Sequence, residues 1–517
     1  MSVNVDVLTL PLFINGKWEE PVSGETFDIF NPATGELAAK AAKGTKEDVD
    51  KAVLAARHAF DHTEWKSMKP KERSKVMNAI AHQIIQHAEE LAFLECISSG
   101  GTIRRITSND ILQMADLFQT FGKFVLDYPY SETLPNPPFP GPAHNFIWRE
   151  PIGVCAAITP WNMPMLIAAW KIAPALAMGN TLVIKPASYT PLSTLKLAEI
   201  ISKVVPPGVI NAVSGPGAET GEALVRHPKV DKVAFTGSTE VGRSIMKLAA
   251  ETVKNTTLEL GGKSPNIIFE DADLSLALPG SLFGVFLHSG QLCESGTRLF
   301  VPESMHDEIV EGLLALTKKL KLGNPLETST DVGPIISKKQ KDSILAYIQS
   351  GLKEGATLVC GGKEVSVPGC EGGSFIEPTI FTNVTNEMKI AQEEIFGPVL
   401  SIIKYSDEEE AIRLANDTIY GLAAGVWTRD VNKAYAAARK LQAGVVWIND
   451  WHMLRNDAPF GGYKQSGIGR EMGKHSLDAY TQVKHVHTSM VSDLHKRNWY
   501  GILFSEQNQT DRGEDGC

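Results

Sequence analysis

A cysteine and a glutamate could together carry out covalent chemistry on a carbonyl compound. Cys293 ends a Gly-Gln-Leu-Cys segment, and Glu259 lies 34 residues upstream, just before two glycines. A thiol attacks only as the thiolate, and at its usual pKa of about 8.5 few thiols are ionised at pH 7, so a catalytic cysteine needs activating neighbours. A glutamate beside a dry pocket has a raised pKa that suits a general base. Taken alone, Cys293 would be an inert core thiol and Glu259 a solvated strand-end residue.

Asn162 is a third candidate for the same chemistry. It stands between Pro160 and Pro164, at the end of a strand predicted over 152–158. A side-chain amide at that place can donate a hydrogen bond to a developing oxyanion, which is worth about 100 to 1000-fold in rate. The alternative is an ordinary turn asparagine. The presence of Cys293 favours the catalytic interpretation.

Two strand-to-helix turns could hold a dinucleotide. Residues 236–242 (Thr-Gly-Ser-Thr-Glu-Val-Gly) open a helix whose free N–H groups could bind a pyrophosphate, although the segment lacks the G-x-G-x-x-G pattern. Lys185 and Ser188 follow another strand, where an adenosine ribose would lie. The alternative for residues 236–242 is a turn with a structural role only. The alternatives for Lys185 and Ser188 are a surface lysine and a helix-capping serine.

The composition indicates small-molecule chemistry in a reducing compartment. There are 50 Lys and Arg residues against 60 Asp and Glu, and the net charge of -10 argues against nucleic acid or an anionic membrane as a partner. Six cysteines without closely spaced Cys or His partners fit neither a disulfide scaffold nor a zinc site, so we expect no metal. No basic residue precedes Lys17, so no export signal is predicted and we expect a cytoplasmic protein.

One long apolar segment could be mistaken for a membrane helix. Residues 151–184 carry Lys171 as their only charge. Three internal prolines divide the segment into pieces that are too short to cross a bilayer. We therefore expect a buried strand, a turn and a helix, and no membrane association.

The order of elements predicts an α/β protein with a doubly wound parallel sheet. The expected strands are 152–158, 181–184, 209–213, 232–235 and 257–260, and the expected helices are 165–178, 192–205, 219–226 and 240–251. Alternation of this kind is typical of parallel sheets. A second α/β region is expected over about 265–465, with strands 299–301 and 445–448 and a helix over 305–320. A proline-rich connector or arm is expected over 127–142, and the polar segment 505–517 is expected to be disordered.

Taken together, these motifs resemble the NAD(P)-dependent aldehyde dehydrogenase superfamily, in its hydrolytic, non-acylating form. The similarity covers about residues 10–490. It rests on the segments Pro160-Trp161-Asn162, Lys185-Pro186, Phe235-Thr236-Gly237-Ser238-Thr239-Glu240, Glu259-Leu260-Gly261-Gly262-Lys263, Gly290-Gln291-Leu292-Cys293, Glu393-Glu394-Ile395-Phe396-Gly397-Pro398 and Pro459-Phe460-Gly461-Gly462-Tyr463-Lys464.

The resemblance implies a three-part architecture and a set of cofactor contacts. It implies an NAD(P)-binding domain of Rossmann type over 1–133 and 152–262, a catalytic domain over 263–465, and a small β oligomerisation arm over 134–151 and 477–493. Relatives are usually dimers or tetramers, so a homodimer or homotetramer is expected. The implied cofactor contacts are Ile158, Thr159, Pro160, Trp161, Lys185, Ser188, Gly217, Phe235, Gly237, Ser238 and Val241, with Glu394 and Phe396 at the nicotinamide ribose and ring.

The resemblance also implies a mechanism. The Cys293 thiolate attacks an aldehyde, Asn162 and the Cys293 N–H hold the oxyanion, hydride passes to NAD(P), and water activated by Glu259 hydrolyses the thioester. Glu259 favours hydrolysis over acyl transfer to coenzyme A or phosphate. The competing classes are a cysteine hydrolase or acyltransferase without a redox cofactor, and a catalytically silent structural relative.

Three departures from the family pattern bear on specificity. Ser188 stands where many NAD-preferring relatives carry Glu, which predicts that NADP is accepted beside NAD. Leu292 and Glu294 flank the nucleophile, and Glu294 either faces the substrate tunnel, where it would favour a cationic aldehyde, or is solvated. The other positions that match the tunnel are mostly apolar and predict a hydrophobic aliphatic or aromatic aldehyde with a broad range. They are Met163, Trp170, Leu287, Trp451, Met453 and Leu454.

Overall fold

The computed structural model of the chain describes residues 8–136, 141–493 and 496–503. Two compact units are formed, one by Met1–Leu126 with Gly153–Tyr480 and the other by Asp127–Ile152 with Thr481–Cys517. The expected disordered segment 505–517 and residues 137–140 of the expected arm lie outside the described residues.

The first unit contains an eight-stranded sheet in the order β20-β12-β11-β8-β9-β10-β2-β3. Its five central strands run parallel, and the edge strands are antiparallel to their neighbours. The central strands are buried on both faces, as parallel strands usually are. The bounds are β2 Leu12–Ile14, β3 Lys17–Glu19, β8 Val154–Ile158, β9 Thr181–Lys185, β10 Ile210–Ala212, β11 Lys232–Thr236, β12 Asn255–Glu259 and β20 Gly467–Ile468.

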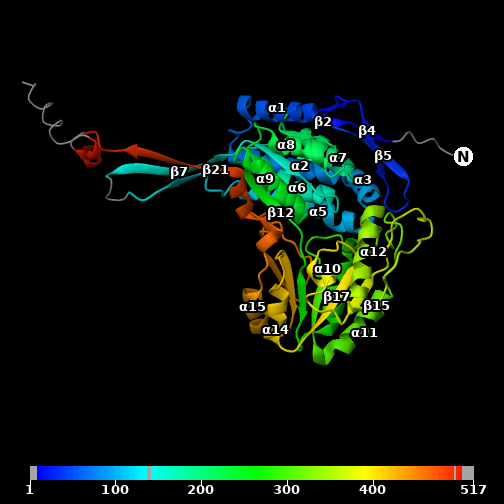
Figure 1. The fold of residues 1–517 in the computed structure, drawn as a ribbon. Coiled ribbons are helices and arrows are strands. Elements are labelled where there is room, and N and C mark those ends of the chain that lie inside the picture. Colours follow the sequence, from blue (N-terminus) through cyan, green and yellow to red (C-terminus); the bar gives the residue numbers. More distant parts are fainter. Residues whose placement is uncertain (1–7, 137–140, 494–495, 504–517) are drawn as a thin grey trace, which may run out of the picture. The chain divides into compact units, whose positions relative to one another are not determined.

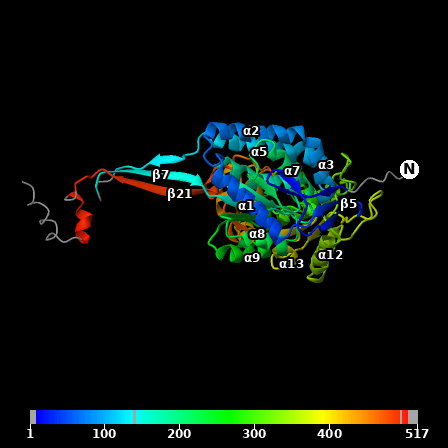
Figure 2. The same ribbon diagram turned by 90° about the horizontal axis from the view of Figure 1, so that it is seen from above.

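Helices cover both faces of this sheet, which makes it doubly wound (Figure 2). Apolar residues of α1, α8 and α9 pack with one face in a single core cluster. Helices α2, α5 and α7 lie on the other side. The bounds are α1 Lys46–His62, α2 Pro70–Gln86, α3 Ala88–Ser99, α4 Ile103–Arg105, α5 Ile111–Phe124, α6 Pro164–Ala177, α7 Leu192–Ser202, α8 Glu222–Arg226 and α9 Thr239–Ala250. A small sheet of β1 Thr9–Leu10, β5 Leu37–Ala42 and β4 Thr26–Phe30 adjoins them.

The second sheet of this unit has seven strands in the order β15-β16-β17-β14-β13-β18-β19. Figure 1 shows β15 and β17 of this sheet among helices α10, α11, α12, α14 and α15. All neighbours are parallel except β15 and β16. Helices α12, α14 and α15 pack on one face, and α10 and α11 on the other. The bounds are β13 Pro265–Ile268, β14 Arg298–Pro302, β15 Thr357–Cys360, β16 Thr379–Thr382, β17 Val399–Tyr405, β18 Ala423–Trp427, β19 Val445–Ile448, α10 Leu274–Phe286, α11 His306–Thr317, α12 Lys338–Lys353, α13 Lys389–Gln392, α14 Glu408–Asn416 and α15 Val431–Lys440.

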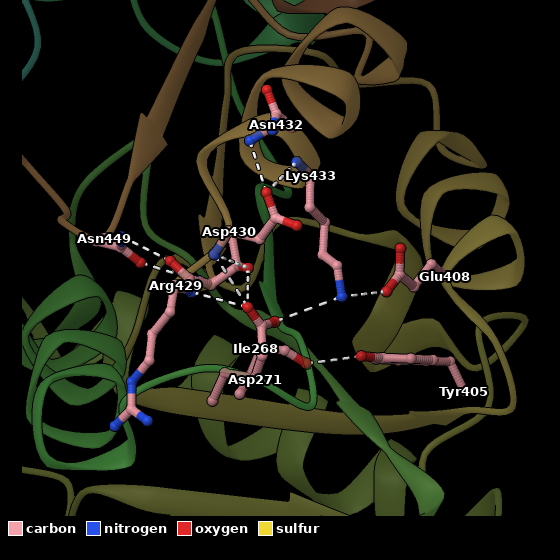
Figure 3. A network of polar contacts seen from close by, with 10 residues as sticks. Ile268, Asp271, Tyr405, Glu408, Arg429, Asp430, Asn432, Lys433 and Asn449 are labelled. Atoms are coloured by element: carbon pink, nitrogen blue, oxygen red, sulfur yellow. Dashed lines mark hydrogen bonds and ion pairs between the residues drawn. The ribbon is translucent and has the colours of Figure 1, made fainter.

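A polar network ties together the carboxyl ends of four strands of the second sheet (Figure 3). Asp271, just after β13, accepts hydrogen bonds from the Thr428 hydroxyl at 2.6 Å and from the N–H groups of Arg429 and Asp430 at 3.0 Å each. The Tyr405 hydroxyl at the end of β17 donates to the Ile268 carbonyl at 2.8 Å. These bonds satisfy backbone groups that the strands leave unpaired. Asn449, just after β19, joins the network through two bonds of its side chain to the backbone of Thr428.

The second unit is a three-stranded antiparallel sheet in the order β21-β7-β6. Its strands are β6 Ser131–Thr133, β7 Ala143–Pro151 and β21 Thr481–Ser489. The arm was expected over 134–151 and 477–493, whereas the unit begins at 127 and its second segment at 481. Residues 477–480 belong instead to a 3-10 helix, Lys474–Tyr480, of the first unit.

Several expected elements are shorter in the structure than in the sequence pattern. The helix expected over 192–205 ends at Ser202, shortly before Pro206, which cannot continue it. The helix expected over 219–226 begins as a π turn, Gly217–Gly221, and becomes α8 only at Glu222. The expected doubly wound α/β fold is confirmed.

Candidate active site

A cavity of about 280 Å³ lies where the two sheets of the first unit face each other. Its lining comes from the segments that follow β8, β11 and β12 of the eight-stranded sheet, from loops that precede β14 and β17 of the seven-stranded sheet, and from helix α12. The carboxyl ends of one sheet therefore meet the amino ends of the other. The lining residues are Pro160, Trp161, Asn162, Thr236, Gly237, Ser238, Leu260, Gly261, Cys293, Gln340, Ser343, Tyr347, Glu394, Ile395 and Phe396.

Cys293 reaches this cavity on a strained loop. His288 and Ser289 have φ values of 50° and 57°, and Gly290 has φ of 69°. A Cβ at Gly290 would lie 2.1 Å from the Gly397 carbonyl oxygen, so only glycine fits. Left-handed backbone at non-glycine residues is costly and tends to occur at functional sites.

Gln291 holds the loop in place. Its side-chain amide donates to the carbonyls of His288 at 3.1 Å and Pro334 at 3.2 Å, and its Oε1 accepts from the Ile336 N–H at 3.0 Å. Asn162 Nδ2 donates to the Gln291 carbonyl at 2.9 Å. The structure thus brings Asn162 and Cys293 to one cavity, with the asparagine amide oriented by the nucleophile's own loop.

The Cys293 thiol donates a hydrogen bond to Glu294 Oε2 at 3.2 Å. Burial raises the pKa of the thiol well above its usual range, and the Glu294 charge raises it further. The thiol is therefore protonated at rest, and its attack on a carbonyl requires a group that takes the proton.

Glu259 ends β12 but does not line the cavity that contains Cys293. Its side chain is 2% exposed, and neither carboxylate oxygen has a hydrogen-bond partner among the described residues. Burial raises the pKa of this carboxyl group well above its usual range, and nearby Glu471 adds to the effect. A raised pKa is the direction that a general base near neutral pH requires.

Lys171 and Glu471 form a buried ion pair that the sequence interpretation missed. Lys171 also donates to the Thr236 hydroxyl at 2.7 Å, and both charges act on Glu259. Lys171 was noted only as the single charge of an apolar segment. A lysine buried in an apolar segment requires a polar partner, so the sequence indicated that Lys171 has one. Nothing near Lys171 in the sequence identified that partner as Glu471.

The expected cofactor residues separate into two groups. Those that line the Cys293 cavity are Pro160, Trp161, Gly237, Ser238, Glu394 and Phe396. Those that do not line it are Ile158, Thr159, Lys185, Ser188, Gly217, Phe235 and Val241. The Phe396 ring meets Trp161 edge to face, with 5.1 Å between centroids, and Glu394 Oε1 accepts from the Gly262 N–H at 3.1 Å. Burial raises the pKa of Glu394 to about 7.

The first turn of α9 is capped by a side chain and lies close to the sheet. Ser238 caps the helix by accepting from the Val241 N–H at 3.3 Å. A side chain at Gly237 would strike the Phe235 ring, so a glycine keeps the turn close to the sheet. A Cβ placed on Gly217 would meet no atom within 4 Å. There is therefore open space in front of this residue, in the turn after β10.

The residues present fit a dinucleotide. Lys185 is 2% exposed, and its ammonium donates to the Pro186 carbonyl at 2.6 Å, which leaves donors for ribose hydroxyl groups. Burial lowers the pKa of Lys185 to about 8. Thr159 Oγ1 is buried without a hydrogen-bond partner among the described residues. The Ser188 hydroxyl donates to the Gly215 carbonyl at 3.0 Å.

A second cavity, of about 580 Å³, lies on the other side of the nucleophile's loop. Six of the eight expected tunnel residues line it: Met163, Leu287, Leu292, Glu294, Met453 and Leu454. The other two expected tunnel residues do not. Trp451 is fully buried, and its indole fills the space above Gly284, Gly296 and Gly425, while Trp170 packs on Phe460 with 5.3 Å between ring centroids.

Glu294 is buried in this second cavity and is only 5% exposed, so the solvated alternative is wrong. Its Oε1 accepts from His452 Nδ1 at 3.1 Å. Burial raises the pKa of Glu294, but the hydrogen bond and charge of His452 outweigh it and hold the pKa below its usual value. The carboxylate is therefore ionised at neutral pH. Nothing in the residues around Glu294 or His452 indicated this contact.

The doubly wound sheet of Rossmann type, and a cysteine at a cavity between two α/β sheets, define the class of α/β protein to which the chain belongs. The aldehyde dehydrogenase family model matches residues 18–486, and the chain belongs to this family. It is similar to a putative aldehyde dehydrogenase, DhaS, of Bacillus subtilis, with 47% identity over 92% of this chain and 95% of that protein.

Two further relatives agree with the family assignment. The betaine aldehyde dehydrogenase of B. subtilis is 46% identical over 92% of this chain and 96% of its own length. The crystal structure of betaine aldehyde dehydrogenase from Staphylococcus aureus in complex with NAD+ has a TM-score of 0.91 and 44% identity, covering 94% of this chain and 96% of that one. The chain is thus an NAD(P)-dependent aldehyde dehydrogenase by family.

Proposed function

We propose that the protein oxidises a hydrophobic aldehyde to the carboxylic acid through a covalent Cys293 intermediate. The observation that supports this most strongly is the position of Cys293. The thiol lines the cavity that also contains Trp161, Glu394 and Phe396, while its neighbours Leu292 and Glu294 line the larger cavity. An aldehyde would approach the sulfur from the larger cavity, and a cofactor would approach it from the smaller one.

The residues of the chain take distinct roles in this proposal. The sulfur of Cys293 bonds to the aldehyde carbon, and the Asn162 amide, already oriented by Gln291, donates to the resulting oxyanion. Bound NAD(P) supplies the hydride acceptor. Glu259, whose pKa is raised by burial, takes a proton from the water that hydrolyses the thioester and frees the thiol.

The lining of the larger cavity favours a hydrophobic aliphatic or aromatic aldehyde. Most of its residues are apolar, and methionines at positions 163 and 453 can adapt to several shapes. Its charged residues other than Glu294 are Arg104, Arg105, Lys319 and Asp331, so cations outnumber acids. A cationic aldehyde is the second candidate, because Glu294 is buried there and two relatives are named betaine aldehyde dehydrogenases.

We propose NAD as the cofactor, with NADP also accepted. The relative from S. aureus was solved with NAD+. Ser188 places no negative charge near the ribose, and the Lys185 ammonium lies three residues away with donors to spare. A 2′-phosphate would therefore meet no repulsion there. We propose 1–133 and 152–262 as the cofactor-binding domain and 263–465 as the catalytic domain.

We further propose a cytoplasmic homodimer or homotetramer. Both edges of the three-stranded sheet are mostly exposed strands, β6 and β21, which could pair with a second copy. All five cysteines among the described residues are free thiols, which fits a reducing compartment. Within 8–136, 141–493 and 496–503, no helix has both the length and the apolarity of a membrane span. Light scattering with size-exclusion chromatography measures the assembly, and a monomer would refute it.

A panel of aldehydes with NAD and with NADP tests the function. The proposal predicts reduced nicotinamide and carboxylic acid in equal amounts, with longer aliphatic and aromatic aldehydes preferred over betaine aldehyde. A preference for betaine aldehyde would replace the hydrophobic substrate with the cationic one. Ester hydrolysis without any reduced nicotinamide would favour the cysteine hydrolase.

A further inference from the structure

The buried pair of Glu294 and His452 lies beside the nucleophile without a role in the reaction as described so far. Glu294 Oε2 accepts from the Cys293 thiol at 3.2 Å, and Oε1 accepts from His452 Nδ1 at 3.1 Å. The three side chains form one chain of hydrogen bonds. Glu259, by contrast, has no hydrogen-bond partner among the described residues and does not line the cavity that holds the thiol.

We propose that Glu294 is the base that accepts the Cys293 proton during attack on the aldehyde, and that His452 positions it. The inference rests on the proposed function. As the Sγ–C bond forms, the carbonyl π electrons move to oxygen, and the S–H bond breaks toward Glu294 Oε2, which leaves a thiohemiacetal oxyanion and a neutral carboxyl group. Glu259 is then needed only for the water that hydrolyses the thioester.

The direction of proton transfer follows from the change at sulfur. In the resting enzyme the thiol holds its proton, because burial and the Glu294 charge both raise its pKa. Once sulfur shares an electron pair with the aldehyde carbon, it becomes far more acidic, and a carboxylate already hydrogen-bonded to it is the nearest acceptor. Transfer in concert with bond formation avoids a buried thiolate beside a carboxylate.

His452 is held by the loop that leaves the second sheet. Asn449 has φ of 55°, and its side chain bonds both the N–H and the carbonyl of Thr428 at 2.9 Å, at the edge of the polar network (Figure 3). His452 itself has φ of 61°, and its ring lies edge-on to Phe283 at 5.4 Å. The imidazole is thus oriented toward Glu294 by backbone and packing.

The charged groups around Glu294 are few. Besides Cys293 and His452, the larger cavity has Arg104, Arg105, Lys319 and Asp331 in its lining. Arg104 pairs with Asp331 at 2.8 Å, and Arg105 pairs with Asp110 at 3.1 Å. His452 is the side chain that hydrogen-bonds the carboxylate on the side away from the thiol.

The test measures hydride transfer alone, in a Glu259→Gln background where hydrolysis is blocked. Rapid mixing with aldehyde and NAD gives the rate of the single turnover from pH 6 to 9. We expect this rate to level off with pH when Glu294 is present. With Glu294→Gln added, it should fall at least 10-fold at pH 7 and rise about tenfold per pH unit without a plateau, because hydroxide then replaces the base.

Two further variants make the result specific. Asp457→Asn removes an exposed carboxylate of the His452 loop and should leave the rate unchanged. His452→Phe removes the donor that lowers the Glu294 pKa, so the fall of the single-turnover rate at low pH should move to higher pH. If Glu294→Gln does not fold, the His452→Phe variant still tests whether Glu294 is the base. An unchanged or faster rate in Glu294→Gln, or an unshifted fall of the rate at low pH in His452→Phe, would overturn the proposal. Absence of any hydride transfer in the unmodified protein would instead refute the proposed function.

Discussion

Cys293 and Glu294 are consecutive residues whose side chains line two different cavities, yet the thiol donates to the carboxylate at 3.2 Å. The peptide between them forms part of the wall that separates the two spaces. A carbonyl carbon bonded to sulfur would thus lie at this boundary. The placement of the nucleophile, more than the identity of any single lining residue, supports oxidation by a bound dinucleotide.

Asn162 should contribute through the transition state. Asn162→Ala removes an amide already aimed by its bond to Gln291, so kcat should fall about 100 to 1000-fold, as for other single oxyanion donors. Alkylation of Cys293 by iodoacetamide forms no oxyanion and should change little. Equal losses in both reactions would show that the substitution disturbs the loop and not the oxyanion.

The rate of hydrolysis should depend on the ionisation of Glu259. Burial raises the pKa of this carboxyl group well above the usual value of about 4.3, and the base works only when deprotonated. Steady-state kcat should therefore fall about tenfold per pH unit below a midpoint that lies well above 4.3. A pH series that separates the hydride burst from steady turnover measures this. A flat profile down to pH 5 would contradict the assignment.

Cofactor choice should be governed by Ser188. We expect kcat/KM for NAD to exceed that for NADP by less than about 1000-fold, roughly 4 kcal/mol. Ser188→Glu adds a charge that repels the 2′-phosphate, so NADP should lose at least 10-fold while NAD keeps its rate. A wild-type preference for NAD beyond 1000-fold would refute the prediction.

Substitutions at Lys171 and Glu471 should have non-additive effects on the free energy of unfolding. Both side chains are buried, so Lys171→Met leaves an unpaired charge and should cost about 3 to 5 kcal/mol in unfolding free energy. The double variant Lys171→Met with Glu471→Leu should recover most of the loss. Urea unfolding measures both. Additive losses would show that the charges act independently.

The sequence predicted much of the fold, because its signals are local. β19 was predicted at its observed bounds, and β11 and α9 within one residue, because apolar runs, glycines and capping residues mark them. The sequence did not predict that the carboxyl ends of the first sheet meet the amino ends of the second at the site, because this arrangement depends on strand order and packing. Trp170 and Trp451 were misplaced because an aromatic residue near a site can as easily fill the core as line a cavity.

The environment of Glu294 shows the same limit. A carboxylate next to a nucleophile in sequence is compatible with a solvated or a buried side chain, and only the fold brings His452 to it. Glu471 likewise reaches Lys171 across 300 residues. Long-range polar pairs of this kind have no signature in a single sequence.

The central claim is that Cys293 carries the acyl group after hydride transfer. Glu259→Gln, mixed with aldehyde and NAD and then quenched in acid, should form one equivalent of reduced nicotinamide per subunit, and steady turnover should fall about 100 to 10,000-fold. Peptide mass spectrometry should then find the acyl mass on Cys293. Reduced nicotinamide without an adduct, an adduct on another residue, or undiminished turnover would contradict the account.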